Sequence, residues 1–516
     1  MNSLTTDRPD VVVAGAGPTG LTLACELALA GVKVLVLERR TAVDTTVKAG
    51  AINTPSAEAY YRRGLLPALT EIQQEAMGRV SSFVARARET GAGELRPAPR
   101  FAGHFAALPL DGRLLDASDP EFGDPGPAAT VGLVPQQRLE ELLEARAAEL
   151  GAEIRRGTEI KGFEADDDGV TVRTGAGTVR TGWLVGCDGG RSTVRKTAGF
   201  DFPGTDPEIT GRQALVSMEG AEALGVGWQT TETGHYVHGP MPGRILTVEF
   251  DGPPADRESP VTAEELEASL RRVAGVDVTV TAVHSATRFT DNARQATAYR
   301  KGRVLLAGDA AHVHSPFGGQ GLNLGVGDAM NLGWKLAATV RGDAPEGLLD
   351  TYTAERHPIG AWVLEWTRAQ IAVMRPGPHA RAMRAVVADL MGTAEGTTYF
   401  VKKISGAWQG YDLPGDHPLT GRSAPDLALA DGTRLGDRLH RGRALLLDLH
   451  DDPAVRAAAD GYAGRVELVT ARCPERPETG ALLVRPDGFV AWASGAGPAD
   501  GLGAALRLWF GEPVLS

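Results

Sequence analysis

A strand, a glycine-rich loop, a helix and a second strand follow one another within the first 38 residues of the chain. Residues 10–14 (DVVVA) predict a buried strand, residues 15–20 (GAGPTG) a tight loop, and residues 21–31 (LTLACELALAG) a helix with one apolar face. Residues 32–38 (VKVLVLE) predict the second strand. A strand–helix–strand unit of this kind implies a parallel sheet covered by helices. The sequence therefore predicts an α/β fold.

The three glycines of the loop suit the binding of a dinucleotide. Gly15 permits the tight turn, Gly17 lets a pyrophosphate approach the backbone, and Gly20 lets the helix and strand pack closely. Glu38 ends the second strand, 18 residues after Gly20, where a carboxylate can accept hydrogen bonds from a ribose. The pattern predicts a dinucleotide site, and the alternative is a glycine turn beside an incidental surface glutamate. A similar loop at residues 495–501 has its third glycine one residue late, so we interpret it as a plain strand-to-helix turn.

Composition limits the class of protein. Of the 516 residues, 42% are apolar and 23% charged, which is typical of globular proteins and unlike disordered chains. The formal net charge of −12 argues against a nucleic-acid-binding protein, which needs a basic surface. No apolar run approaches the roughly 20 residues that span a bilayer, and the first ten residues lack a signal-peptide pattern. Cys25, Cys187 and Cys473 are isolated and form no CxxC motif. We therefore expect a cytoplasmic protein with no nucleic-acid or membrane partner.

The rest of the chain alternates between this buried-strand pattern and strand-rich segments. Residues 75–130 alternate weakly, as in SSFVARA and HFAALPLDGRLL, and predict half-buried antiparallel strands. Residues 136–150 predict a helix that stops at Gly151, and residues 200–290 predict a separate α+β lobe with one helix. The buried-strand pattern returns at RVLLAGDAAH and is followed by two long helices. The first domain is therefore expected to be discontinuous, and a compact unit of about 100 residues should follow it.

Two further motifs make the pattern specific. Residues 187–195 (CDGGRSTVR) contain a DG motif, and residues 308–312 (GDAAH) contain a GD motif that runs on to PFGGQGLN at residues 316–323. In this order and spacing, the three motifs resemble the class A flavin-dependent monooxygenases related to para-hydroxybenzoate hydroxylase. Within this family, the resemblance is stronger to the actinomycete aromatic polyketide hydroxylases and to rifampicin monooxygenase, through the stretch at residues 302–336. The last domain resembles the thioredoxin-like appendage of that subgroup.

The resemblance implies a domain arrangement. A Rossmann-like, GR2-type FAD-binding domain would comprise residues 1–75, 130–200 and 290–412. An inserted α+β sheet domain for the substrate would comprise residues 76–129 and 201–289. Residues 413–516 would form the thioredoxin-like domain, serving as a dimerisation or stabilising appendage or as a cover over one flank of the substrate entrance. The chain is expected to be a monomer or a homodimer.

The resemblance also assigns residues to FAD and to NADPH as co-substrate. The DG motif residues Asp188 and Arg191 belong to a motif that the family associates with both molecules. Two positions depart from the family pattern: Lys48 stands where relatives usually have arginine, and Gly327 where they commonly have glutamine. The residues that would bind FAD are Gly15, Gly17, Pro18, Thr19, Gly20, Glu38, Arg39, Lys48, Gln136, Asp309, Pro316, Gly319, Gly321, Leu322 and Asn323.

No side chain can be named as a catalytic base. The flavin itself would carry the chemistry, with Pro316 beside its isoalloxazine ring. His235 and Trp228 are candidates for contact with the substrate, and the alternative for the histidine is an exposed loop position. His312 and His314 form an H-x-H pair without a carboxylate or cysteine at ligand spacing, so no bound metal is expected.

The expected function is that of an FAD-dependent, NADPH-consuming monooxygenase. By resemblance, it would hydroxylate a polycyclic aromatic polyketide or a similar phenolic natural product through a flavin C4a-hydroperoxide. Two alternatives stay open. One is a Baeyer–Villiger ring cleavage on the same fold, and the other is a flavin-containing scaffold or drug-sequestering protein without enzymatic activity.

Overall fold

A six-stranded sheet forms the centre of the largest part of the molecule. The computed structural model describes residues 8–89, 101–239, 241–256 and 259–514. The sheet has the order β17-β18-β9-β1-β2-β5, parallel except for β17 at one edge. Its central strand β1 contains three fully buried valines and ends at the buried Ala14, as expected for a strand covered on both faces. Its strands are β1 (Val11–Ala14), β2 (Val34–Leu37), β5 (Glu153–Arg155), β9 (Trp183–Gly186), β17 (Arg300–Lys301) and β18 (Val304–Leu306).

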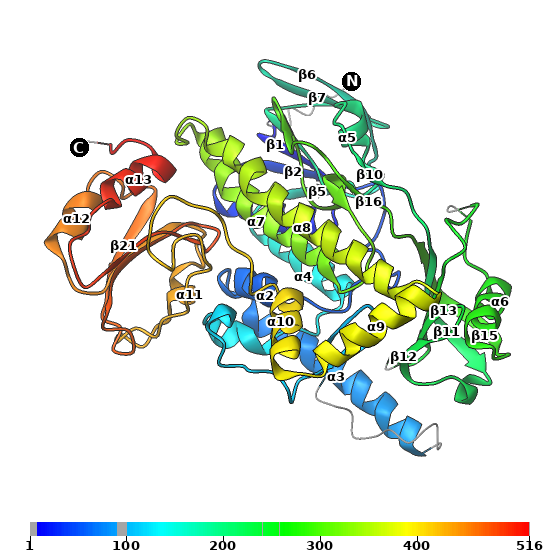
Figure 1. Cartoon of the computed structure of the whole chain (residues 1–516). Helices are drawn as coiled ribbons and strands as arrows, with labels where there is room; N and C mark the ends of the chain where they lie inside the picture. Colours follow the sequence, from blue (N-terminus) through cyan, green and yellow to red (C-terminus); the bar gives the residue numbers. More distant parts are fainter. Residues whose placement is uncertain (1–7, 90–100, 240, 257–258, 515–516) are drawn as a thin grey trace.

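Helices cover this sheet, and the two longest among them, α7 and α8, lie side by side across the middle of the molecule (Figure 1). The apolar face of α1 packs against both α4 and α7. The predicted helix at residue 136 and its stop before Gly151 are confirmed, as are the two long helices after the GD motif. The covering helices are α1 (Pro18–Leu29), α4 (Gln136–Glu149), α7 (Gln320–Arg341) and α8 (Thr351–Met374).

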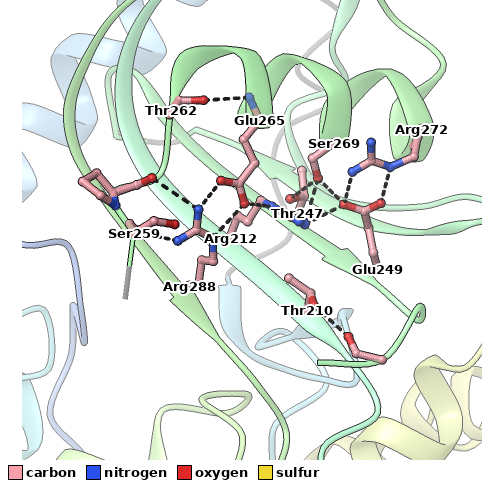
Figure 2. A network of polar contacts seen from close by, with 12 residues as sticks. Thr210, Arg212, Thr247, Glu249, Ser259, Thr262, Glu265, Ser269, Arg272 and Arg288 are labelled. Atoms are coloured by element: carbon pink, nitrogen blue, oxygen red, sulfur yellow. Dashed lines mark hydrogen bonds and ion pairs between the residues drawn. The ribbon is translucent and has the colours of Figure 1, made fainter. Parts of the chain in front are cut away.

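A second sheet, with the order β12-β13-β14-β11-β15, lies to one side of these helices (Figure 1). Alternate residues face opposite ways, so that Val237 and Leu246 join one apolar cluster with α8, whereas Tyr236 and Ile245 join another with α6. Arginine–carboxylate pairs also bind α6 to its face of the sheet (Figure 2). The elements are β11 (Thr210–Glu219), β12 (Gly227–Thr230), β13 (Gly234–His238), β14 (Arg244–Glu249), β15 (Thr279–Phe289) and α6 (Ala263–Ala274).

The prediction of strands in residues 75–89 is wrong, because this segment belongs to the 24-residue helix α3 (Leu66–Glu89). SSFVARA contains strand-forming residues, but the preceding segment LPALTEIQQEAM is rich in strong helix formers, and extending an existing helix is favourable. The second half of that prediction is confirmed by the hairpin of β3 (Phe101–Phe105) and β4 (Leu108–Asp111). Residues 90–100 lie outside the described residues.

The last part of the chain forms a four-stranded sheet of its own, with the order β21-β20-β22-β23. We call residues 411–514 the C-terminal unit. The turn at residues 495–501 joins a strand to a helix, as predicted. The unit contains α11 (Leu435–Arg438), β20 (Ala444–Asp448), α12 (Pro453–Ala459), β21 (Val466–Thr470), β22 (Thr479–Val484), β23 (Val490–Gly495) and α13 (Leu502–Phe510).

The remaining elements connect these parts. In the described part of the chain, no helix combines the length and apolar character needed to cross a membrane. The connecting helices and strands are α2 (Thr54–Tyr61), β6 (Ile160–Asp166), β7 (Gly169–Thr174), β8 (Gly177–Thr181), α5 (Thr193–Thr197), β10 (Gly204–Thr205), β16 (Ala293–Gln295), β19 (His312–Val313), α9 (Pro378–Met391) and α10 (Ala394–Ser405).

Candidate functional site

The glycine loop between β1 and α1 is tightly packed at two of its glycines and open at the third. A Cβ atom on Gly15, whose φ is +104°, would lie 2.4 Å from the carbonyl oxygen of Cys187. A Cβ atom on Gly20 would lie 2.0 Å from the carbonyl oxygen of Gly15, so helix and loop could not pack as they do. Around Gly17, in contrast, no heavy atom lies within 4 Å of the Cβ position. The loop therefore leaves room for a ligand at the helix N-terminus, where anions are favoured.

A cleft of about 420 Å³ opens in front of this loop. It lies at the carboxyl ends of β1, β2 and β9, the position at which open parallel sheets bind nucleotides. The structure brings together in its lining thirteen of the residues predicted to bind cofactor. They are Gly15, Gly17, Pro18, Thr19, Glu38, Arg39, Lys48, Gln136, Asp188, Arg191, Asp309, Gly321 and Leu322.

Four predicted residues fall outside this lining: Gly20, Pro316, Gly319 and Asn323. Gly20 packs against the loop. Gly319 and the exposed Pro316 belong to the segment that leads into α7, for which Gly319 is the N-cap in the left-handed conformation at φ +63°. Asn323 holds that helix start in place, because its Oδ1 accepts a hydrogen bond from the backbone N–H of Asn53 at 2.9 Å. Phe317, between Pro316 and Gly319, packs against Trp228 and Phe289, so this segment connects the cleft with the second sheet.

Glu38 is held by backbone groups at the end of β2. Its Oε2 accepts a hydrogen bond from the N–H of Ala16 at 2.8 Å, and its Oε1 accepts one from the N–H of Arg40 at 2.8 Å. Each carboxylate oxygen has a second lone pair, so the side chain can still accept bonds from a ribose. The site thus offers a fixed acceptor beside a loop that can hold a pyrophosphate, which fits the nucleotide half of FAD.

Lys48, the departure from the family's arginine, forms an ion pair with Asp44 at 2.6 Å. Burial raises the pKa of Asp44, but hydrogen bonds from Lys48 and Thr46 outweigh it and lower that pKa to about 2. The segment is also tied to α4, because the N–H of Gln136 donates to the carbonyl of Ala49 at 2.9 Å. Lysine therefore retains a positive charge at the cleft, though without the bidentate geometry of arginine.

The DG motif is joined to the GD motif by an arginine that sequence reasoning missed. Asp188 Oδ2 accepts hydrogen bonds from the N–H groups of Thr193 and Val194, and so caps α5. The buried Arg195 donates to the carbonyl of Gly190 at 2.8 Å and to that of Ala310 at 2.9 Å. The sequence did not indicate this role for Arg195, because both of its acceptors are backbone oxygens.

The GD loop is fixed from behind by Asp328 on α7. The N–H of Gly308 donates to Asp328 Oδ2 at 3.0 Å, and His312 Nε2 lies 2.7 Å from the same oxygen. Asp309, between two buried residues, is exposed and lines the cleft. No carboxylate stands at ligand spacing to His312 in the sequence, but the fold brings Asp328 to it from 16 residues further along the chain. Within the described residues, no group of three or more His, Cys, Asp or Glu side chains is placed to hold a metal ion.

Arg356 on α8 completes this buried cluster and accounts for Gly327. Its Nε donates to Asp328 Oδ1 at 2.8 Å. A Cβ atom on residue 327 would lie 2.6 Å from Arg356 Nη2, so the glycine gives space to the guanidinium group. Burial raises the pKa of Asp328, but the charges of His312 and Arg356 outweigh it and lower that pKa.

The candidate substrate residues lie on the face of the second sheet that points toward the start of α7. The Trp228 ring is 6.1 Å from that of Phe317, which follows Pro316, and 4.9 Å from that of His104. The alternative of an exposed loop position is wrong for His235, which is buried on β13. Its Nε2 lies 2.7 Å from the carbonyl of Met374 and its Nδ1 lies 3.1 Å from Thr230 Oγ1, so both ring nitrogens are engaged.

Arg244 is a partly buried cation on this face, two residues before the inward-facing Leu246. Its Nε is buried with no hydrogen-bond partner among the described residues. Burial and the charge of Arg244 lower the pKa of His104 to about 4, so the imidazole is neutral near pH 7. The Nδ1 of His104 is likewise buried without a partner in the described part of the chain. Arg244 Nε and His104 Nδ1 are therefore both available to form hydrogen bonds with an oxygen atom of a ligand bound on this face.

Comparisons with known proteins agree with this arrangement. The family described as "FAD binding domain" matches residues 8–367, and the family "Aromatic-ring hydroxylase, C-terminal" matches residues 417–513. The chain is 43% identical to the 12-dehydrotetracycline 5-monooxygenase/anhydrotetracycline 6-monooxygenase of Streptomyces rimosus subsp. rimosus, covering 98% of this chain and all of that protein. It is 41% identical to the dialkyldecalin synthase of Streptomyces rugosporus, over 97% of this chain and 98% of that protein. The solved structure of an anhydrotetracycline hydroxylase from Streptomyces rimosus superposes with a TM-score of 0.83 at 41% identity, covering 98% of this chain and all of that one.

Proposed function

The chain belongs to the FAD-binding aromatic-ring hydroxylases, and from this premise we propose that it is an NADPH-consuming monooxygenase of polycyclic aromatic polyketides. The observation that carries the proposal is the continuity between two regions. The cleft that suits FAD ends at Gly321 and Leu322 on α7, and the aromatic face of the second sheet meets Phe317 just before that helix. A flat aromatic substrate lying on this face would be close to the flavin end of the cofactor.

Bound FAD would supply the activation of O₂ after reduction by NADPH, because the protein's own side chains cannot perform that chemistry. The glycine loop and Glu38 would hold the nucleotide half, and Asp309 would lie beside the middle of the cofactor. The N-terminus of α7 would present backbone N–H groups and a positive dipole to negative charge on the reduced ring. The chain thus contributes orientation and electrostatic stabilisation.

The second sheet would position the substrate. The ring of Phe317 lies 5.9 Å from that of Phe289 and 6.1 Å from that of Trp228, between the second sheet and the start of α7. Such rings pack well on fused aromatic systems and exclude water. Arg244, with its unpartnered Nε, would bind a phenolate or carbonyl oxygen of the substrate, and neutral His104 would donate or accept a proton beside it. Of the two residues named from sequence, Trp228 suits substrate contact better than His235, whose nitrogens are occupied.

The similarity to a dialkyldecalin synthase favours a second candidate. In that case the flavin fold would bind an open-chain precursor and promote a ring closure without net oxidation. The two functions differ in their consumption of NADPH and in the mass of the product.

The test uses the purified protein with FAD and a panel of tetracyclic and angucyclic quinones and phenols. We expect a yellow protein, acceleration of NADPH oxidation by one panel member, and a product heavier by one oxygen atom. A product of unchanged mass formed without NADPH from an added open-chain polyene would instead support the ring-closing function, and a protein that cannot be loaded with FAD would overturn both. Arg244→Met should raise the KM for the substrate about 10-fold or more, since a charge-assisted hydrogen bond is worth about 1.5–3 kcal/mol. The exposed-side variant Arg272→Ala, on the opposite face of the sheet, is the matched control and should leave KM unchanged.

A further inference from the structure

The hairpin turn at residues 485–489 of the C-terminal unit is inserted against α7 and α8. Arg485, at the start of this turn, is fully buried and makes a bidentate ion pair with Glu355 of α8, at 3.0 and 2.7 Å. It also donates to Asp487 Oδ1 at 3.1 Å. Glu355 in turn accepts a hydrogen bond from Asn331 at 2.6 Å and pairs with Lys335 at 3.0 Å, both on α7. We call these five residues the inner cluster.

The inner cluster adjoins the residues that hold the GD loop. Asp328, Asn331 and Lys335 are spaced three and four residues apart and therefore lie on one face of α7. Glu355 and Arg356 are neighbours on α8, the first bound to the C-terminal unit and the second to Asp328. A movement of α8 that displaces Glu355 therefore also displaces Arg356 relative to Asp328. The other carboxylate oxygen of Asp328 accepts the hydrogen bond from the N–H of Gly308.

A tyrosine connects the two sets directly. Arg356 Nη1 donates to the hydroxyl oxygen of Tyr411 at 3.4 Å. The ring of Tyr411 lies 5.1 Å from Arg485 Cζ and 4.2 Å from the ring of Phe489. The guanidinium groups of Arg485 and Arg356 thus contact the ring and the hydroxyl of one side chain. Arg485 Cζ is also 4.6 Å from the Trp509 ring, which belongs to the last helix.

We propose that Arg485 is a positioning residue for FAD, through which the C-terminal unit holds α7 and α8 in the register that fixes the GD loop. This inference rests on the FAD dependence assigned above. Burying so many charges costs free energy, which a passive appendage with an apolar interface would avoid. In the observed arrangement these charges pair with one another, so a relative movement of the three elements would leave buried charges without partners. Loss of Arg485 leaves Glu355 free to move and Asp328 less well aligned with Gly308.

The test is a titration of FAD-free protein with FAD, followed by quenching of flavin fluorescence, alongside thermal unfolding of the FAD-free form. Arg485→Met should weaken FAD binding about 2- to 30-fold, the range seen for mutations that act through contiguous networks. Arg485→Lys keeps the charge and should restore part of the affinity. The wild-type titration itself tests whether the chain binds FAD, so that failure of the proposed function would be recognised separately.

Arg62→Met is the matched control. Arg62 is also buried and also joins the main body to the C-terminal unit, donating to the carbonyl of Ala424 at 2.8 Å and to Ser423 Oγ at 3.0 Å. Its side chain also packs against Gly488 of the turn, but its hydrogen bonds do not reach α7, α8 or the GD loop in the described structure, so its loss should lower the unfolding temperature and weaken FAD binding much less than Arg485→Met does. If Arg62→Met weakens FAD binding as much as Arg485→Met does, the effect is general loosening and the proposal is wrong.

Tyr411→Phe provides a second variant that removes one hydroxyl and creates no cavity. It should weaken FAD binding about 2- to 5-fold with little change in unfolding temperature, since it removes only the long bond, at 3.4 Å, that Arg356 Nη1 donates to this hydroxyl. If Arg485→Met does not fold, this variant decides: unchanged affinity in Tyr411→Phe overturns the proposal. Unchanged affinity in a folded Arg485→Met protein overturns it as well.

Discussion

Two arginine–carboxylate networks built from the same residue types occupy different surroundings. In the inner cluster Arg485 is 0% exposed and its partner Glu355 is 6% exposed. In the network of Figure 2, on the outer side of the second sheet, Glu249 is 7% exposed, whereas its partner Arg272 is 53% exposed. We call the latter, formed with Arg212, Glu265 and Arg288, the outer network. Water can replace a lost partner in the outer network and cannot do so in the inner cluster.

The difference extends to what each network holds. The outer network attaches α6 to strands that already pair with one another, so sheet hydrogen bonds maintain the geometry if one ion pair is lost. In the described part of the chain, the inner cluster joins three elements with no backbone hydrogen bonds between them, namely α7, α8 and the turn at residues 485–489. Their register therefore depends on side chains, both on these ion pairs and on apolar packing such as that of Trp334 against Trp509. This comparison teaches that similar ion pairs differ in importance according to solvent access and to the other interactions at the same interface.

The largest difference should appear on removing Arg356, next to the inner cluster. Arg356→Met leaves the buried Asp328 with only His312 and the Gly308 N–H as partners. Removing one partner of a buried ion pair costs about 3–5 kcal/mol, so the urea midpoint of the transition that unfolds α7 and α8 should fall accordingly. If the free energy of unfolding falls by less than about 1 kcal/mol, the buried ion pairs around Arg356 contribute no more to stability than the exposed pairs of the outer network.

A smaller difference should appear in the pH dependence of stability. Lys335 is fully buried, and burial followed by the charge of Arg485 lowers its pKa from 10.5 to about 7, although Glu355 and Asp487 act in the opposite direction. Between pH 7 and pH 9 the unfolded chain keeps this proton while the folded chain releases it. Stability therefore rises with pH over this window, by about 2 kcal/mol for one such group.

The measurement compares wild type with Lys335→Met at pH 7 and pH 9. The wild-type protein should gain stability relative to the variant as pH rises, because only the wild type carries the lysine. An unchanged difference between the two pH values would contradict the low pKa. The outer network contains no lysine, and its carboxylates respond in acid. Burial raises the pKa of Glu249, but hydrogen bonds from Arg272 and Ser269 and the charge of Arg212 outweigh it and lower that pKa, so stability is lost as pH falls below about 4.

The sequence predicted those parts of the structure that are determined by residues close together in the chain. The glycine loop, the strand pattern of β1 and the end of β2 at Glu38 all follow from local spacing, and they position the cleft. The failure at α3 has a local cause too, since SSFVARA favours a strand only when the helix formers before it are ignored. The motifs at residues 187–195 and 308–323 were recognisable because their backbone turns require glycine at fixed places.

The charged residues behind the cleft could not be predicted in this way. Asp328 meets Gly308 across 20 residues, Arg356 meets Asp328 across 28, and Arg485 meets Glu355 across 130. Each looks like an ordinary surface residue on its own helix or turn, because its partner is brought to it by tertiary packing. The contacts of Arg195 and His235 could not be predicted for a related reason. Both side chains contact backbone carbonyls, which every residue has, so the sequence does not identify the partner. Only Gly327 left a trace in the sequence, as a departure whose cause is the guanidinium group of Arg356.

The smallest expected effect is that of Arg272→Ala in the outer network. Arg272 donates to both oxygens of Glu249, at 2.6 and 3.0 Å, but it is more than half exposed. After its loss Glu249 keeps Arg212 Nη1 and Ser269 Oγ, both of which remain within hydrogen-bond distance. An exposed ion pair contributes about 0.2–1 kcal/mol, so the free energy of unfolding should fall by less than about 1 kcal/mol.

Salt sharpens the result for this variant. Added salt screens an exposed pair more than a buried one, so the difference between wild type and Arg272→Ala should shrink between low salt and about 1 M, where the Debye length is about 3 Å. The difference between wild type and Arg356→Met should persist, because the ions cannot reach a sealed pair. Urea midpoints of the three proteins at the two salt concentrations test both statements. Equal salt sensitivity in the two variants would mean that the inner region admits solvent, and that the alignment of the GD loop depends on packing rather than on its charges.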